Sequence, residues 1–348
     1  MLPLVTPFRT SFGTESAKDV VVLRYRRADG AEGWGECVAL SEPTYSSEYA
    51  AGAHHVLEHH LLPRVLAGRS LDDVQGHAMA KAAVEMAVLD AALRAGGVSL
   101  ATHLGGVRDA VDAGVSVGMT DTTPALVAAV EAYLAEGYVR IKCKVEPGCD
   151  VEPLAAVRAA VGPDVLLQVD ANAAYSIDDA EHLACFDELG LLLIEQPLPA
   201  RDLRGHAALA ARLRTPICLD ESIESLDDAG EALDAGACSI VNIKSGRVGG
   251  LAEAVRIHDL CARRGVPVWC GGMLETGLGR AANVALASLP GFTLPGDLSA
   301  SRRWFEEDLT EPFELVGGQL RVPTGPGLGV TPVASVLHAR TQSVTLVR

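Results

Sequence analysis

The sequence contains few aromatic residues and no long apolar run. Phe, Trp and Tyr make up 4% of the 348 residues, so the core must be mainly aliphatic, as is usual for buried parallel strands. No window approaches 18 uncharged apolar residues, and the opening MLPLVTPFRT has no basic flank, which argues against a membrane-spanning helix or an export signal. We therefore expect a cytoplasmic protein.

The chain also lacks a basic block. Its formal net charge is −16 at pH 7, and no stretch rich in Lys and Arg could follow a phosphate backbone, so we expect no nucleic-acid partner. The eight cysteines form no CxxC pair and are interpreted as buried free thiols in a reducing compartment.

Lysine is scarce as well. Only five of the 29 basic residues are Lys, and three of them, Lys142, Lys144 and Lys244, end strand-like runs. Arg stays protonated in proteins, whereas Lys can lose its proton when its surroundings favour it. In YVRIKCKV, the two lysines stand at alternate positions and therefore share one face of a strand. This placement favours proton transfer over ordinary ion pairing.

After Lys144, single charged residues end successive apolar runs at steps of 26, 25, 25 and 24 residues: Asp170, Glu195, Asp220 and Lys244. One strand, one helix and two short loops take about that length. The rhythm gives eight candidate strands, AGVSVGM, YVRIKCKV, VLLQVDA, LLLIEQP, TPICLDES, SIVNIKSG, VPVWCGGM and FTLPGD. Eight strands close a parallel barrel. A doubly wound sheet has a similar period, but no GxGxxG follows the first strand, so we expect the barrel.

Both chain ends lie outside this rhythm. Strand-like runs occur at 18–27 and 34–40, and helical patterns at 46–62, which Pro63 should stop, and at 76–95. The segment after residue 300 is rich in Gly and Pro and should pack back on the first unit. We therefore predict a capping domain over the barrel mouth, with residues 1–110 and 301–348 in the cap and 111–300 in the barrel.

Side chains at the carboxyl ends of barrel strands converge on one pocket. Asp170, Glu195 and Asp220 would bring three carboxylates together there, and a hard divalent cation relieves their repulsion. We expect Mg²⁺, with Mn²⁺ or another divalent ion as a substitute. The lysines of the second strand and Lys244 would flank a carboxylate substrate on that metal, which stabilises the enediolate formed when the α-proton leaves.

The lysines would have to act as general bases. Nearby positive charge and the metal should lower their pKa values toward neutrality. Arg247, three residues after Lys244, is either part of that effect or a surface arginine.

The motifs IKCK, QVDAN, IEQPL, LDES and VNIKSGRVGG resemble the enolase superfamily, in the muconate lactonizing enzyme subgroup. GGMLETGLGRAANVALASLPGFTLPGD and VPTGPGLGV resemble the family of o-succinylbenzoate synthases and N-succinylamino acid (N-acylamino acid) racemases. Enolase-superfamily sites combine a Lys or His base with Mg²⁺. Over nearly the whole chain, the resemblance implies a modified (β/α)₇β barrel with an α+β capping domain, and a homo-oligomer, either dimer or octamer.

The resemblance also implies roles for the charged residues. Mg²⁺ would bind the three acids, Lys144 and Lys244 would be the acid/base pair, and Lys142 would support Lys144. In the synthase reaction, a dehydration in menaquinone biosynthesis, Lys144 would take the proton and Lys244 would stabilise the intermediate as a cation. In racemisation, one lysine would remove the α-proton and the other would return it to the opposite face.

In that family, the seventh barrel strand and a mobile amino-terminal loop shape the substrate pocket. The corresponding positions here are Gly271, Gly272, Met273 and the loop from Pro7 to Gly13 with Phe8 and Phe12, and the polar neighbours at strand ends are Ser116 and Asn172. Packing between cap and barrel is an equal alternative for the two phenylalanines.

Three alternatives stay open. A dipeptide epimerase would carry Asp-x-Asp on the last barrel strand, whereas here Asp297 is followed by Leu298 and Ser299. A cycloisomerase has similar lysines and acids, and muconate turnover would identify it. A non-catalytic binding protein would have lost a lysine or an acid of the set, and none is lost here.

Overall fold

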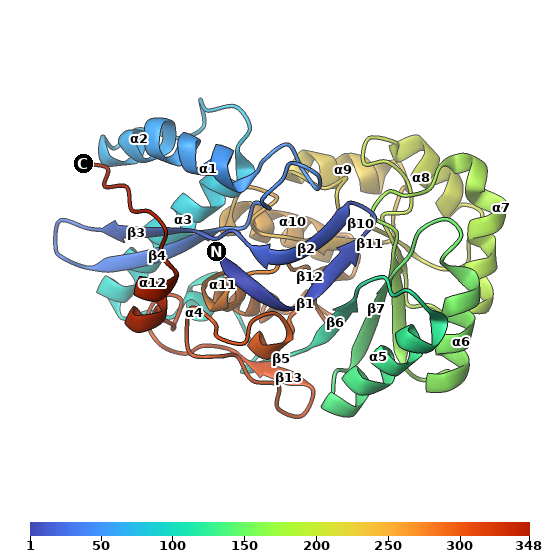
Figure 1. Cartoon of the computed structure of the whole chain (residues 1–348). Helices are drawn as coiled ribbons and strands as arrows, with labels where there is room; N and C mark the ends of the chain where they lie inside the picture. Colours follow the sequence, from blue (N-terminus) through green and yellow to red (C-terminus); the bar gives the residue numbers. More distant parts are fainter.

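Seven parallel strands form the central sheet of the computed structural model, which describes residues 1–348. They are β6 (Gly114–Val117), β7 (Arg140–Lys144), β8 (Leu166–Asp170), β9 (Ile194–Glu195), β10 (Ile217–Leu219), β11 (Ile240–Ile243) and β12 (Val268–Cys270). Their hydrogen-bonded order follows the chain, and Figure 1 shows the sheet curling on itself. The predicted rhythm of strands and the barrel class are confirmed.

The eighth predicted strand, FTLPGD, closes the ring without a regular ladder. Isolated bridges join Phe292 to Val268 in β12 and Gly296 to Ala113 beside β6. Pro295 lies between these bridges and has no backbone N–H to donate. The closing segment is therefore held by single bridges.

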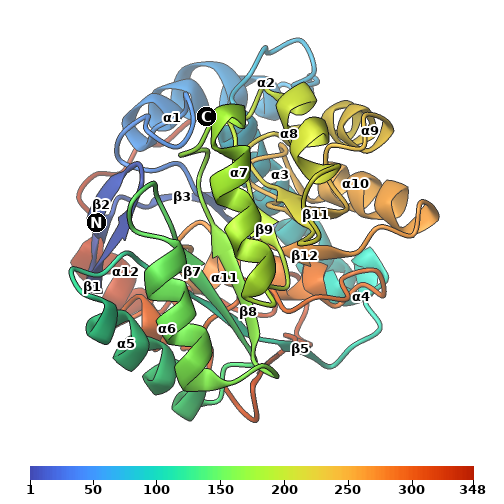
Figure 2. The same ribbon diagram turned by 90° about the vertical axis from the view of Figure 1, so that its right-hand side faces the viewer.

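Helices cover the outside of the barrel, as Figure 2 shows for α5 to α10. They are α5 (Thr123–Glu136), α6 (Val151–Val161), α7 (Ala180–Leu183), α8 (Leu203–Ala210), α9 (Leu226–Asp234), α10 (Leu251–Arg263) and α11 (Gly277–Ala287), with 3₁₀ turns at Ile177–Asp179, Ala184–Glu188 and Ser301–Arg303. Local sequence sets their ends: the hydroxyl of Ser225 accepts a hydrogen bond from the Asp228 N–H at the start of α9.

The remaining elements pack beside and over the barrel. They are β1 (Leu2–Thr10), β2 (Gly13–Lys18), β3 (Val21–Arg26), β4 (Glu32–Cys37), α1 (Ala50–Val56), a π-helical turn (Leu57–Leu61), α2 (Leu62–Leu66), α3 (Ala78–Gly96), α4 (Leu100–Leu104), β5 (Ala110–Asp112), β13 (Gln319–Arg321) and α12 (Ala334–Arg340). Antiparallel pairs join β1 to β2, β3 to β4, and β5 to β13.

Two local predictions are wrong. The segment from Pro7 to Gly13 is not a loop but the turn end of the β1–β2 hairpin, in which only Ser11 and Phe12 form the turn. Pro63 does not stop the helix that precedes it, because the chain passes through the π-helical turn and Pro63 falls in the first turn of α2. A proline is tolerated there, since its missing N–H needs no partner within that turn.

The contact between β4 and α3 explains the glycines of the EGWGEC strand. A Cβ added at Gly33 would lie 2.2 Å from the carbonyl oxygen of Ala87, and one at Gly35 would lie 2.1 Å from that of Ala83. Only glycine allows the strand to approach the alanine face of the helix this closely. The alanine-rich run predicted as a helix at 76–95 is confirmed as α3.

The carboxyl-terminal segment contacts α3, as the sequence predicted. The Leu328 N–H donates to Asp90 Oδ1 at 2.7 Å, and the Arg94 guanidinium donates to the Val330 carbonyl at 2.5 Å. The domain boundaries at residues 110 and 300 stay a prediction. Six cysteines are buried, but Cys149 is partly exposed and Cys185 is exposed, so the expectation of buried thiols is wrong for these two. No helix combines the length and apolarity needed to span a membrane.

Glu36, at the end of β4, joins the cap to the barrel. Its buried carboxylate accepts hydrogen bonds from the Thr276 N–H (3.0 Å), the Thr276 hydroxyl (2.7 Å) and the Gly279 N–H (2.9 Å). These donors lie at the start of α11, where backbone N–H groups have no partner within the helix. An acid from one unit thus caps a helix of the other.

Replacing Glu36 by Ala is expected to lower the free energy of unfolding by about 3 kcal/mol, because buried donors lose their acceptor. Urea unfolding followed by circular dichroism measures the change. Glu32→Ala is the control, since Glu32 lies in the same strand but forms a partly exposed ion pair with Arg24, worth less than about 1 kcal/mol. Equal losses in the two variants would contradict the joining role of Glu36.

Candidate active site

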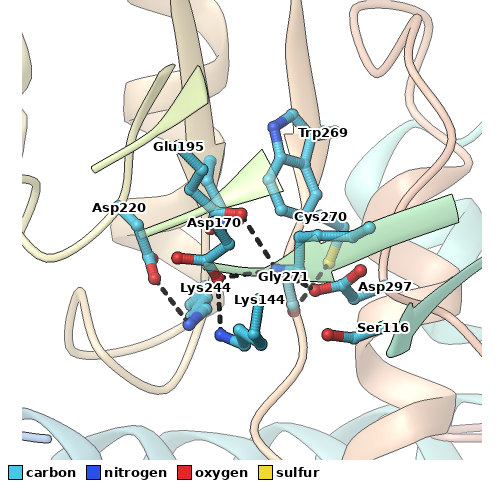
Figure 3. A network of polar contacts seen from close by, with 12 residues as sticks. Ser116, Lys144, Asp170, Glu195, Asp220, Lys244, Trp269, Cys270, Gly271 and Asp297 are labelled. Atoms are coloured by element: carbon cyan, nitrogen blue, oxygen red, sulfur yellow. Dashed lines mark hydrogen bonds and ion pairs between the residues drawn. The ribbon is translucent and has the colours of Figure 1, made fainter. Parts of the chain in front are cut away.

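The predicted acids and lysines lie together at the carboxyl edge of the sheet (Figure 3). The strand register places Lys144 beside Asp170 and Asp170 beside Glu195. Asp220 and Lys244 directly follow β10 and β11. The parallel order of the strands therefore brings together residues that are about 25 positions apart in the chain, as the sequence predicted.

Lys142 lies among three carboxylates. Its Nζ is 2.5 Å from Asp297 Oδ2, 2.9 Å from Glu195 Oε2 and 3.2 Å from Asp170 Oδ2. Asp297 also accepts a hydrogen bond from Arg140 at 2.8 Å. All of these side chains are buried or nearly so, and each carboxylate is compensated by at least one cation.

The other two lysines each have one carboxylate and one neutral oxygen as partners. Lys144 Nζ donates to Asp170 Oδ2 and to Asn172 Oδ1, both at 2.6 Å. Lys244 Nζ donates to Asp220 Oδ2 at 2.8 Å and to the Tyr45 hydroxyl at 3.1 Å. The two ammonium groups are thus held by different acids on different strands.

The pKa values of two lysines differ from the expectation. Burial lowers the pKa of Lys142, but the carboxylates of Asp297, Glu195 and Asp170 outweigh this effect and raise it above its ordinary value. The pKa of Lys244 is likewise raised, because Tyr45 and nearby carboxylates outweigh burial. In this arrangement the carboxylates stabilise the two ammonium groups, and the fall toward neutrality that a bound metal would cause stays a prediction.

The carboxylates respond in opposite directions. Burial favours a higher pKa for Asp170, but Lys144 and Lys142 hold that pKa well below its usual range. Burial and the neighbouring charge of Asp170 raise the pKa of Glu195. Like charges at this distance cannot all be ionised without cations between them.

Arg247 is buried and belongs to the site, which resolves the alternative left open by the sequence. It contacts Asp220 Oδ1, and its Nη1 donates to the Tyr45 hydroxyl at 3.1 Å. Tyr45 comes from the segment before α1, so the cap contributes directly to the surroundings of Lys244. Nothing in the sequence around Tyr45 indicated this role.

A cavity of about 100 Å³ lies above these groups, between cap and barrel. Of the predicted residues, the cavity is lined by Phe8, Phe12, Ser116, Lys142, Lys144, Asn172, Lys244, Gly272 and Met273. Gly271 does not line it. A Cβ at Gly271 would lie 2.3 Å from Asn242 Oδ1 and 2.8 Å from Lys244 Cε, so this glycine makes room for the lysine instead.

Thr10, which lies within the predicted stretch from Pro7 to Gly13, also lines the cavity. Sequence reasoning missed several other lining residues: Glu15, Leu40, Thr44, Leu274, Glu275 and Trp304. They come from loops, from the hairpin and from the carboxyl-terminal segment. In these parts no periodic sequence pattern indicates which side chains face the cavity. The one available signal was Trp304, one of only three tryptophans. Its ring contacts Phe8 edge to face at 5.0 Å.

The predicted metal ligands suit a hard divalent cation in chemical type. Asp170, Glu195 and Asp220 supply buried carboxylate oxygens from adjacent strands, which are the donors that Mg²⁺ prefers. Their side chains do not form a ready-made group of three ligands, because the lysine ammonium groups hold their oxygens. Lysine side chains are long and flexible, so a cation could replace their charge without a change in the strands.

Fold and site together define a barrel enzyme in which lysines flank a set of acids at the strand ends. Residues 125–336 match the family described as enolase C-terminal domain-like, and residues 1–105 match the mandelate racemase / muconate lactonizing enzyme amino-terminal domain. The chain therefore belongs to the enolase superfamily, in the muconate lactonizing enzyme subgroup, and is an enzyme.

Close relatives include a racemase and a synthase. An N-succinylamino acid racemase from Amycolatopsis sp. is 61% identical over 97% of this chain and 94% of its own length. An o-succinylbenzoate synthase from Geobacillus stearothermophilus is 50% identical over 94% of this chain and 90% of its own.

Solved structures agree with the fold. An enolase superfamily member from Listeria innocua has a TM-score of 0.94 at 41% identity, covering 98% of this chain and 95% of its own. A dipeptide epimerase from Enterococcus faecalis, solved with Mg and the dipeptide L-Leu-L-Tyr, has a TM-score of 0.86 at 26% identity, covering 95% and 96%.

Without metal, Lys142→Met is expected to lower the free energy of unfolding at pH 7 by about 3 to 5 kcal/mol, because buried carboxylates lose their cation. Asp170 and Asp297 have folded pKa values below their ordinary value. Such groups stabilise the fold above the unfolded pKa of about 3.9, and this contribution is lost as the pH falls through the folded pKa. The loss in free energy of unfolding should therefore be largest at pH 7 and become smaller below about pH 4.

Urea unfolding in EDTA over this pH range measures the deficit. Lys81→Met is the matched control, because Lys81 donates to the Val74 carbonyl in the cap and contacts none of these acids. A deficit that does not change with pH would contradict the electrostatic explanation.

Proposed function

We propose that the protein removes the proton α to a carboxylate and acts as an N-succinylamino acid (N-acylamino acid) racemase, as an o-succinylbenzoate synthase, or as both. The observation that carries the proposal is that Lys144, from β7, and Lys244, directly after β11, line the same cavity. The acids of β8, β9 and β10 lie between these strands. The names of the relatives at 61% and 50% identity support the same reactions.

The proposed metal is Mg²⁺, with Mn²⁺ or another divalent ion as a substitute, held by Asp170, Glu195 and Asp220. When bound, it supplies the positive charge that stabilises the enediolate form of the substrate. The Asn242 side chain donates to Glu195 Oε1 at 2.8 Å and so orients one of these acids. A cytoplasmic location and a homo-oligomer also belong to the proposal.

The two lysines would transfer the proton. In racemisation, Lys144 removes the α-proton from one face while Lys244, as the ammonium, protonates the other, and their roles exchange for the opposite enantiomer. In the synthase reaction, a dehydration in menaquinone biosynthesis, Lys144 removes the proton and then assists departure of the β-hydroxyl, while Lys244 stays protonated. Both reactions begin with the same enediolate, so one site can serve both.

The surroundings of Asp297 argue against the dipeptide epimerase alternative. Its carboxylate is already paired with Lys142 and Arg140, and Ser299 stands where a second Asp would be needed. A substrate ammonium group would therefore find no free carboxylate at this strand. The cycloisomerase alternative is tested by muconate turnover, and a binding protein without catalysis would show no proton exchange.

The decisive experiment incubates the protein with Mg²⁺ and each enantiomer of N-succinyl-phenylalanine in D₂O. Proton NMR follows α-proton exchange and polarimetry follows inversion, while the cyclohexadiene substrate of the synthase is tested in parallel. Turnover of either substrate supports the proposal. If neither exchanges nor reacts, the proposed function is wrong.

Lys144→Ala and Lys244→Ala are each expected to reduce racemisation by about 10²- to 10⁴-fold, the usual contribution of a general acid or base. Each variant should still exchange the α-proton of the one enantiomer that faces its remaining lysine. The NMR experiment in D₂O separates exchange from inversion. Lys81→Ala is the control, and racemisation at the wild-type rate in either active-site variant would refute the two-base assignment.

Removing divalent metal with EDTA is expected to abolish exchange of both enantiomers, because the enediolate loses its stabilising charge. Adding Mg²⁺ in excess should restore the rate, and Mn²⁺ should also support it. Circular dichroism before and after chelation checks that the fold is retained. Undiminished exchange in EDTA would show that the acids do not work through a metal.

A further inference from the structure

Asn172 connects Lys144 to an acid that the proposed mechanism does not use. The Asn172 Oδ1 accepts a hydrogen bond from Lys144 Nζ at 2.6 Å, and its Nδ2 donates to Glu221 Oε1 at 2.9 Å. Its backbone has a φ of 43°, a left-handed conformation that Asn tolerates better than most residues. The amide group therefore stands between the lysine and the acid.

The amide must face in one direction for Lys144 to be held. An ammonium group only donates hydrogen bonds, so it needs the oxygen of the amide, while Glu221 Oε1 accepts a hydrogen bond from the NH₂ group. Glu221 therefore favours the orientation in which Asn172 Oδ1 faces Lys144. Without that acceptor, the amide could turn its NH₂ group toward the ammonium and release it.

The surroundings of Glu221 indicate that its carboxylate holds the side chain of Asn172. The other carboxylate oxygen, Oε2, is buried and has no hydrogen-bond partner. Burial without full hydrogen bonding costs free energy, and neither the barrel ladder nor the cap uses this side chain. Glu221 follows Asp220 directly, so the segment after β10 sends one acid toward Lys244 and the next toward Asn172.

We propose that Glu221 is a positioning residue for Lys144 and acts through the Asn172 amide. This inference rests on the proposed proton-transfer function. The carboxylate of Glu221 also helps to raise the pKa of Lys244, but its hydrogen-bonded link leads to Lys144 alone. Because Lys144 faces only one side of the substrate, loss of Glu221 should affect the two enantiomers unequally. A general disturbance of the metal site or of the fold would affect both alike.

The test compares three variants by α-proton exchange of each enantiomer of N-succinyl-phenylalanine with Mg²⁺ in D₂O. Glu221→Leu removes the acceptor and is expected to slow exchange of one enantiomer by about 10- to 100-fold, as small misplacements of a reacting group do. For the other enantiomer, the rate of α-proton exchange should stay within about threefold of the wild-type rate. Glu221→Gln retains an acceptor oxygen and should rescue the selective loss. Glu224→Leu is the matched control, an exposed acid three residues later.

A second variant tests the link from its other end. Asn172→Ala should give the same enantiomer-selective loss, and the double variant with Glu221→Leu should lose no more, because the two residues act through one contact. If Glu221→Leu does not fold, the Asn172→Ala variant still tests the link to Lys144. The positioning role is wrong if both enantiomers lose exchange equally, if Asn172→Ala loses none, or if calorimetry shows weakened Mg²⁺ binding in Glu221→Leu. Absence of exchange in the wild type would instead overturn the proposed function, and this inference with it.

Discussion

Charge compensation among buried side chains at the barrel mouth is the constraint on which the site depends. Acids at the ends of β8, β9 and β10 would repel one another if cations did not lie between them. The lysines of β7 and the lysine after β11 flank these strands on either side in the sheet order. Because a slip of one residue would turn every side chain to the opposite face, the register of these strands is as much part of the site as the side chains are.

The cap is the second requirement, because the barrel alone leaves the site incomplete. Tyr45 supplies the neutral partner of Lys244, Phe8 lines the cavity, and the Ser11 hydroxyl donates to the Asn172 carbonyl at 3.4 Å. These contacts require the cap to sit in one position on the barrel. The buried hydrogen bonds of Glu36 at α11 provide such a fixed attachment, so a contact remote from the chemistry bears on the geometry around Lys244.

The barrel strands and the charged residues could be predicted from the sequence because both follow regular patterns. A repeat of about 25 residues identifies each strand end, and scarce lysines at those ends are conspicuous. Tyr45 could not be predicted, since its role depends on how cap and barrel dock. The helix through Pro63 could not be predicted, because a π-helical turn places the proline in the first turn of α2. The loop at Pro7 to Gly13 was an implication of the family resemblance, and the pairing of β1 with β2 replaces it by a hairpin.

The partners of the two lysines bear on which reaction the site suits. Lys144 is held by Asp170 and the amide oxygen of Asn172, and Lys244 by Asp220 and the hydroxyl oxygen of Tyr45. Each of these neutral side chains has a second partner: the Asn172 NH₂ group donates to Glu221, and the Tyr45 hydroxyl accepts from Arg247. A synthase needs only one base, whereas a racemase needs each lysine both to take and to give a proton. Matched surroundings, with one carboxylate and one neutral oxygen for each lysine, meet that second requirement.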